Sequence, residues 1–155
     1  MVSFRAATRN DRSAIERFAK LASHSHPDRY SEHWGRWGDF GVIAETESDP
    51  CGAAWARLFR WDDLRDPSSS AEFPEVAIAL DPAYRGQGLG SALLRELVLA
   101  ARELGYVALD LSVDRSNLAA IAVYTKLGFK RIDGDTRMLM RAVLNESGGT
   151  LRSVT

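Results

Sequence analysis

The sequence feature that constrains this chain most is a glycine-rich loop between a predicted strand and a predicted helix. Its residues are Arg85, Gly86, Gln87, Gly88, Leu89 and Gly90. The strand is expected over Glu75–Leu80, because the proline that follows at position 82 cannot continue a hydrogen-bonded ladder. The helix is expected over Leu89–Leu104, where apolar residues recur on one face before Gly105 ends it.

This strand–loop–helix arrangement predicts an anion site. Glycine lets backbone amides approach an anion without a side chain in the way. The N-terminus of a helix adds unpaired N–H groups and the positive end of its dipole. Because Arg85 adds a formal positive charge, the loop predicts a site for a phosphate or pyrophosphate.

The rest of the chain predicts an α/β fold with a mixed sheet. A strand over Val107–Val113 follows the helix, so at least one pair of strands is parallel. Other strands are expected over Val2–Ala6, Gly41–Thr46, Gly52–Phe59, Phe129–Ile132 and Thr136–Leu144, with a turn at Ser48–Pro50. Other helices are expected over Asp11–Ala22 and Ser31–Trp37, and from a cap at Ser116 or Asn117 to Leu127 before Gly128.

Length and composition predict a single domain with ordinary globular character. The chain has 155 residues, which we divide into a domain over 1–144 and a polar tail over 145–155. Its 20 basic and 21 acidic residues give no electrostatic reason to expect a nucleic acid or a membrane as partner. A single cysteine, Cys51, and the lack of a signal-like or membrane-spanning stretch favour the cytoplasm.

The glycine-rich loop also allows other interpretations. The simplest is a tight turn without a ligand. A nucleotide-binding P-loop requires Lys and Ser or Thr after its last glycine, whereas Ser91 and Ala92 stand here. A dinucleotide loop has its third glycine where this chain has Ser91, although Asp110 lies at about the distance of the acidic residue that such sites use.

Two motifs at matching separation resemble the GNAT superfamily of acetyltransferases. Arg85–Gly90 matches the (Gln/Arg)-x-x-Gly-x-(Gly/Ala) signature of that family. Asn117–Tyr124, followed by Gly128 and Phe129, resembles its second half in order and spacing. The resemblance implies six to seven strands, mostly antiparallel, with helices on both faces. It also implies a splayed parallel pair formed by Glu75–Leu80 and Val107–Val113.

The resemblance implies acetyl-CoA as cosubstrate, with no metal. The pyrophosphate would rest on the amides of Gln87–Ser91, with Arg85 beside it. The pantetheine arm would pair with the strand near Leu80, as an added strand pairs with a sheet edge. Asn117 would hydrogen-bond the arm, and it would equally serve as a plain helix cap.

The resemblance also implies direct acetyl transfer to a primary amine in a ternary complex. Tyr124 would protonate the leaving thiolate or hydrogen-bond to it, and the amide of Leu80 or a neighbour would bind the oxyanion. Full proton transfer from a tyrosine to a thiolate is uphill by about 1.5 pKa units, roughly 2 kcal/mol, so a hydrogen bond is at least as plausible. Taken alone, Tyr124 could be a packed aromatic. The general base would be Glu75, Glu72 or an ordered water.

The acceptor is expected to be a cationic primary amine drawn by an acidic, aromatic loop. That loop contributes Trp61, Asp62, Asp63 and Glu72. His24, His26 and His33 lack the spacing of a metal site. The protein is expected to be a monomer or a homodimer. Alternatives are a GNAT-like domain that binds acyl-CoA without turnover and, less favoured, a nucleotide-binding module.

Overall fold

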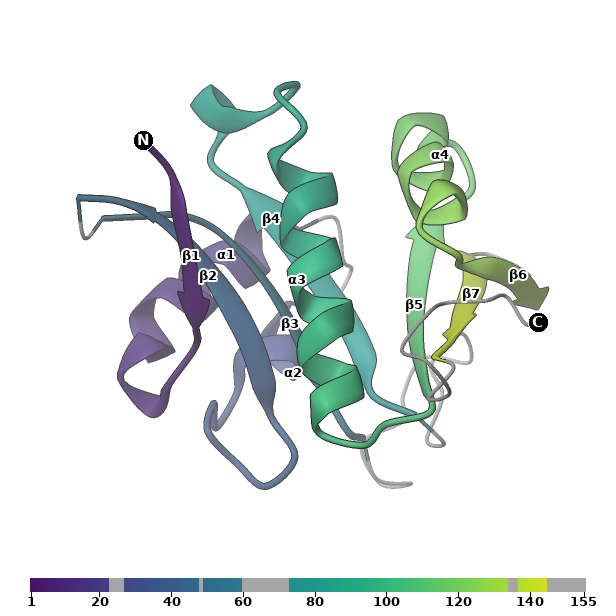
Figure 1. Cartoon of the computed structure of the whole chain (residues 1–155), viewed down its shortest axis with the longest axis horizontal. Coiled ribbons are helices and arrows are strands. Elements are labelled where there is room, and N and C mark those ends of the chain that lie inside the picture. Colours follow the sequence, from purple (N-terminus) through teal and green to yellow (C-terminus); the bar gives the residue numbers. More distant parts are fainter. Residues whose placement is uncertain (23–26, 48, 60–72, 134–136, 145–155) are drawn as a thin grey trace. The chain divides into compact units, whose positions relative to one another are not determined.

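The computed structural model describes residues 1–22, 27–47, 49–59, 73–133 and 137–144. Their strands form one seven-stranded sheet in the order β1-β2-β3-β4-β5-β7-β6 (Figure 1). The strands are β1 (Ser3–Ala6), β2 (Phe40–Thr46), β3 (Asp49–Arg57), β4 (Glu75–Leu80), β5 (Ala108–Asp114), β6 (Lys130–Asp133) and β7 (Arg137–Val143). The α-helices are α1 (Arg12–Leu21), α2 (Asp28–Ser31), α3 (Leu89–Glu103) and α4 (Leu118–Lys126). This mixed sheet with helices confirms the predicted fold class.

The chain divides into two compact units. The first comprises Met1–Arg57 and Ala77–Leu97, and the second comprises Leu58–Val76 and Val98–Thr155. Strand β4 and helix α3 contribute residues to both units.

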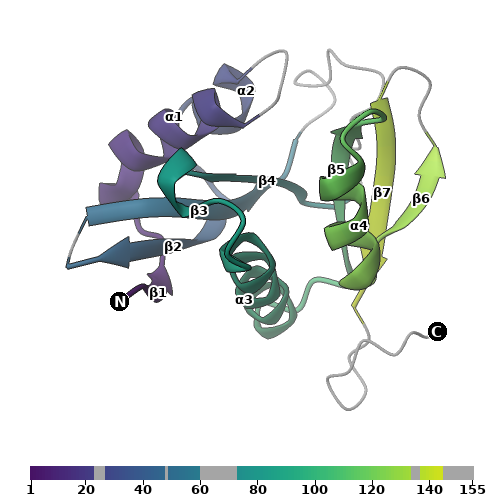
Figure 2. The ribbon, with the colours of Figure 1, turned by 90° about the horizontal axis from the view of Figure 1, so that it is seen from above.

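In the first unit, helices cover both faces of the antiparallel strands β2 and β3. Figure 2 shows α1 and α2 on one face and α3 on the other. Helix α1 buries Ile15, Phe18 and Ala19, which lie on the predicted apolar face. From α3, the first unit buries Leu93, Leu94 and Leu97. Burial of these stripes explains why both helices form where the periodicity predicts them.

The hairpin between β2 and β3 differs from the prediction of a turn at Ser48–Pro50. Strand β3 already begins at Asp49, and Pro50 pairs with Glu45 beside a β-bulge. Glu47 takes the left-handed conformation, with a φ of 46°. The bulge accommodates a proline inside the strand, because a bulge interrupts the regular ladder to which proline cannot donate.

The predicted helix over Ser31–Trp37 is also wrong. Helix α2 ends at Ser31, and positive φ angles at His33 and Gly35 turn the chain away from a helix. Trp34 is buried and its Nε1 donates to the Thr8 carbonyl at 2.8 Å. Trp37, three residues further along the chain, is 87% exposed.

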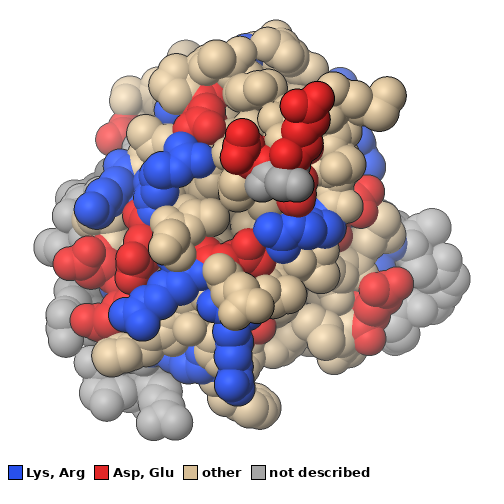
Figure 3. All heavy atoms as spheres, turned by 90° about the vertical axis from the view of Figure 1, so that its left-hand side faces the viewer, with Lys and Arg blue, Asp and Glu red and all other residues tan. Residues whose placement is uncertain are grey.

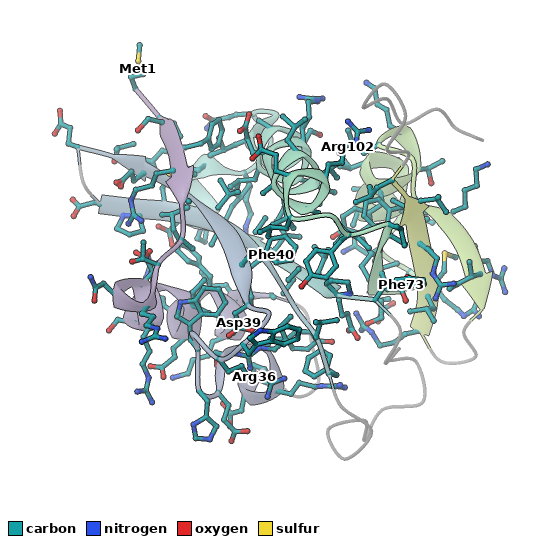
Figure 4. The ribbon with its side chains drawn as sticks, turned by 60° about the horizontal axis from the view of Figure 1, so that its bottom comes forward. Met1, Arg36, Asp39, Phe40, Phe73 and Arg102 are labelled. Atoms are coloured by element: carbon teal, nitrogen blue, oxygen red, sulfur yellow. The ribbon has the colours of Figure 1, made fainter. Side chains whose placement is uncertain are left out.

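A buried ion pair fastens this turn to the sheet. Arg57 on β3 donates from Nε and Nη2 to both carboxylate oxygens of Asp39, at 3.0 and 2.8 Å. Its Nη1 also donates to the carbonyls of Arg29 and Glu32. The side chains of Arg57 and Asp39 are 1% and 2% exposed. Asp39 lies just before β2, next to Phe40 (Figure 4). Full pairing offsets the cost of burying both charges.

In the second unit, β5 pairs antiparallel with β7, and β7 pairs with β6. The parallel pairing of β4 with β5 is recorded at Glu75 and Asp110. Gly105 ends α3 and Gly128 follows α4, both with positive φ, as predicted. Leu104 lies beyond the end of α3 and is 60% exposed, so it does not extend the buried stripe as expected.

The surface of the described residues shows mixed charge. On the face of the protein in Figure 3, Lys and Arg alternate with Asp and Glu, and neither sign forms a continuous patch. Arg5 illustrates this mixing, because it pairs with both Asp11 and Glu45. No helix in the described part of the chain is both long and apolar enough to cross a membrane.

Breaking the buried pair should destabilise the fold strongly. Arg57→Met leaves the Asp39 carboxylate buried without its guanidinium, so we expect the free energy of unfolding to fall by about 3 kcal/mol. Arg12→Met is the matched control, because Arg12 forms an exposed pair with Glu16 and should cost less than about 1 kcal/mol. Urea unfolding measures both. Equal losses would contradict the importance of the buried pair.

Candidate functional site

The glycine loop leaves the end of β4 through a short 3-10 helix over Pro82–Tyr84. The Tyr84 amide donates to the Asp81 carbonyl at 2.9 Å, and the Ala92 amide donates to the Gly88 carbonyl at 3.2 Å. Between these bonds the chain is exposed from Arg85 to Gly88. The loop is therefore joined to the fold at its two ends, by β4 and by α3.

Gly86 and Gly88 are the two positions where this loop requires glycine. Their φ angles are 75° and 81°, in the left-handed region that side chains rarely adopt. Apart from its two chain neighbours, a Cβ placed on either one would meet no atom of the described residues within 4 Å. The backbone at the apex is thus open to solvent, as an approaching anion requires.

Helix α3 begins at Leu89, directly after the open apex. The first amides of a helix have no partner within the helix, so those of Leu89, Gly90 and Ser91 point out of its N-terminus. Together with the helix dipole, these donors favour a negative group at this position. The structure therefore agrees with an anion site built from the backbone.

Two side chains of the loop turn back to the backbone that precedes the loop. Arg85 donates from Nε to the Leu80 carbonyl at 3.2 Å. Gln87 donates from Nε2 to the Ala83 carbonyl at 3.1 Å. Arg85, expected beside the anion, is therefore also a brace between the loop and the end of β4.

The end of β4 contains a close contact that the sequence did not reveal. A Cβ on Gly52 would lie 2.5 Å from Cδ2 of Leu80 and 3.2 Å from the Ala79 carbonyl. Gly52 therefore gives the Leu80 side chain its space. The Asp81 amide donates to the Cys51 carbonyl at 2.9 Å. These contacts fix the position of Leu80, the residue expected to bind the pantetheine arm.

In the second unit, Asn117 caps helix α4. Its Oδ1 accepts from the Ala120 amide at 3.2 Å, and its side chain is exposed. The predicted cap is confirmed, and the choice between Ser116 and Asn117 is resolved. Ser116 instead donates from Oγ to Asp114 at 2.6 Å.

Tyr124 is partly buried on α4, with its ring 6.1 Å from that of Phe129. Burial raises the pKa of Tyr124 to about 12, while the positive charge of Arg137 acts in the opposite direction. The phenol therefore keeps its proton at neutral pH and is a hydrogen-bond donor.

Glu75 lies at the start of β4 and is 1% exposed. Its register partner, Asp110, is fully buried and accepts from Nε and Nη2 of Arg141 at 2.7 and 3.0 Å. The Arg141 guanidinium lies 4.6 Å from the ring centroid of Phe73, which Figure 4 labels. Because its carboxylate is paired with Arg141, Asp110 is not available to bind a ribose. The interpretation of the loop as a dinucleotide site therefore lacks the acidic residue that it requires.

Some residues singled out from the sequence lie outside the described residues. These are the expected acceptor-binding residues Trp61, Asp62, Asp63 and Glu72, and the histidines His24 and His26. Cys51 is buried, and burial, followed by the charge of Asp81, raises the pKa of its thiol, so it is a packed residue and not a nucleophile. Within the ranges described, no three His, Cys, Asp or Glu side chains gather as a metal site.

Comparison with known families agrees with the fold and the loop. Residues 7–129 match the Acetyltransferase (GNAT) family. The match covers most of the chain and includes both the glycine loop and α4. The chain belongs to the GNAT family of acetyltransferases.

Two curated relatives illustrate the similarity. Mycothiol acetyltransferase of Catenulispora acidiphila is 36% identical over 135 residues, which cover 81% of this chain and 42% of that protein. Ribosomal protein bS18 alanine N-acetyltransferase of Escherichia coli K12 is 52% identical over 52 residues, covering 34% of this chain and 35% of that protein. The matches span only 32% to 42% of the length of the mycothiol acetyltransferases.

A solved structure supports the fold over nearly the whole chain. The yncA protein of Salmonella typhimurium, solved with its cofactor acetyl-CoA, superposes with a TM-score of 0.71. The superposition covers 94% of this chain and 95% of that protein, at 21% sequence identity. At 21% sequence identity, the similarity to this solved structure establishes the fold alone.

Proposed function

We propose that the protein is an N-acetyltransferase that moves an acetyl group from acetyl-CoA directly to a primary amine in a ternary complex. The observation that carries this proposal is the open loop over Gly86–Gly88 in front of α3, in a chain of the GNAT family. Backbone donors without neighbouring side chains suit a pyrophosphate. Acetyl-CoA supplies both that pyrophosphate and the acyl group.

The cofactor contacts follow from this assignment. The pyrophosphate accepts from the amides of Gln87–Ser91, beside the charge of Arg85. The pantetheine arm pairs with the backbone at Leu80, whose position Gly52 and the Asp81 amide determine. Asn117 hydrogen-bonds the arm with the donor group of its side-chain amide, because its Oδ1 already caps α4.

Tyr124 acts on the sulfur that leaves. With a pKa of about 12, against about 8.5 for a thiol, full proton transfer is uphill by roughly 3.5 units, or about 5 kcal/mol. A hydrogen bond from the phenol to the sulfur, strengthening as negative charge develops there, is therefore the role we assign.

The acceptor must lose a proton before it can attack. An amine with a pKa near 10.4 is only about 0.04% neutral at pH 7. We assign removal of the proton to Glu75, directly or through water, with Glu72 as the alternative. The oxyanion accepts from the amide of Leu80 or of a neighbouring residue of β4.

The acceptor class rests on sequence alone. Trp61, Asp62, Asp63 and Glu72 combine an aromatic side chain with acidic ones, which suits a cationic amine. The relatives do not narrow the choice, because one name refers to mycothiol and the other to an alanine of a ribosomal protein. We therefore propose a cationic primary amine and no particular molecule.

A bulky side chain at the apex should block the cofactor. Gly88→Trp places an indole where the pyrophosphate would lie, so we expect the Kd for acetyl-CoA to rise at least tenfold. Gly105→Trp is the matched control, since Gly105 also has a positive φ (88°) and open space around it. Both variants should lose a similar stability, about 1–2 kcal/mol from backbone strain. Calorimetric titration measures the Kd, and an unchanged value in Gly88→Trp would place the cofactor elsewhere.

Removing the phenol should slow turnover more than it weakens binding. For Tyr124→Phe we expect kcat to fall roughly 100-fold, with the Kd for acetyl-CoA within about twofold. Because the pKa of Tyr124 is raised to about 12, its deprotonation should cause no loss of rate below about pH 11. The pH–rate profile should therefore keep its shape in the variant at a lower level.

Tyr106→Phe makes the same substitution in the same unit and should leave kcat nearly unchanged. Equal kcat values for Tyr124→Phe and the parent, with chemistry shown to limit the rate, would remove Tyr124 from the mechanism.

A further inference from the structure

Arg17 on helix α1 joins three elements at the point where the glycine loop begins. Its Nη1 donates to Oδ1 of Asp81 at 2.5 Å, and its Nη2 donates to the Pro50 carbonyl at 2.9 Å. Pro50 belongs to β3, and Asp81 is the first residue after β4. The next carbonyl of β3, that of Cys51, accepts from the Asp81 amide. Asp81 is thus held by its main chain and its side chain at once.

Resting on the proposed cofactor role of the loop, we propose that Arg17 is a positioning residue for acetyl-CoA binding. It holds Asp81, the first of the two ends that support the loop, so that the amides of Gln87–Ser91 are already in place before the pyrophosphate arrives. Arg17 itself does not touch the cofactor.

The packing of the loop explains why its ends matter. In the part of the chain that the structure describes, no atom beyond the chain neighbours lies within 4 Å of where a side chain would begin on the apex glycines, Gly86 and Gly88. The bonds from Arg85 and Gln87 stay within residues 80–87. The apex therefore takes its position from α3 at one end and from Asp81 at the other.

The two ends differ in how they are held. The α3 end is secured by buried Leu93, Leu94 and Leu97. The Asp81 end follows β4 and is held beyond the strand by polar contacts, and the side chains of Arg17 and Asp81 are 47% and 27% exposed. Helix α1 carries Arg17 rigidly, because the adjacent Phe18 is fully buried. Loss of Arg17 should loosen this end without unfolding the protein.

A loop that is less ordered before binding must be ordered during binding, which weakens affinity. For Arg17→Met we expect the Kd for acetyl-CoA to rise about fivefold, close to 1 kcal/mol, with kcat at saturation changed less than twofold. Arg17→Lys keeps the charge and should recover part of the affinity.

The matched control is Arg12→Met, on the same helix. Arg12 forms an exposed pair with Glu16 and has no recorded bond to β3 or β4. It should leave the Kd within experimental error. Asp81→Asn should also weaken binding, and combining it with Arg17→Met should add less than the sum of the two effects.

The test pairs calorimetric titration of acetyl-CoA with amide hydrogen exchange of the free protein. Faster exchange over 83–88 in Arg17→Met, together with a raised Kd and no change in Arg12→Met, supports the proposal. Unchanged exchange and Kd in Arg17→Met would overturn it, as would equal effects in the control. If the parent protein fails to bind acetyl-CoA, the proposed function fails and this role falls with it.

Discussion

The first turn of an α-helix carries backbone N–H groups that the helix itself cannot satisfy, and this chain leaves those of α3 open. Gly86 and Gly88 take left-handed conformations, and among the described residues no atom lies within 4 Å of where a side chain would begin on either one, so the backbone in front of α3 is open. Residues around the loop hold this open backbone in position. Gly52 makes room for Leu80, and buried leucines hold the helix behind the loop. An anion site built from the backbone needs such support because its donors cannot move independently.

Two ion pairs among the described residues have different consequences. The Arg57–Asp39 pair is almost completely buried and ties the turn after α2 to β3, so it acts on stability. The Arg17–Asp81 pair is partly exposed, where an ion pair contributes little to stability. Its effect is expected on the order of the loop before binding. Burial thus decides which property each pair governs.

Local signals in the sequence predicted the elements that local chemistry determines. Strand β4 has the predicted bounds, because Pro82 stops it, and α3 ends before Gly105, where a left-handed residue is needed. The glycine loop and the Asn117 cap were predictable because each depends on the chemistry of a few residues that are adjacent in the sequence. Trp34 and Trp37 lie three residues apart in the sequence but have opposite burial, because the chain turns between them at Gly35. The roles of Arg17 and Gly52 depend on strands and helices far apart in sequence, so no local pattern indicated them.

We propose that the open loop serves catalysis of acetyl transfer and not binding alone. The most direct measurement is release of free CoA thiol from acetyl-CoA, with a panel of cationic, neutral and anionic amines and of peptides with free N-termini. We predict release that requires an amine, with cationic primary amines favoured and the rate rising with pH. Binding of acetyl-CoA without thiol release for any acceptor would exclude acetyl transfer to these amines and favour a domain that binds acyl-CoA without turnover.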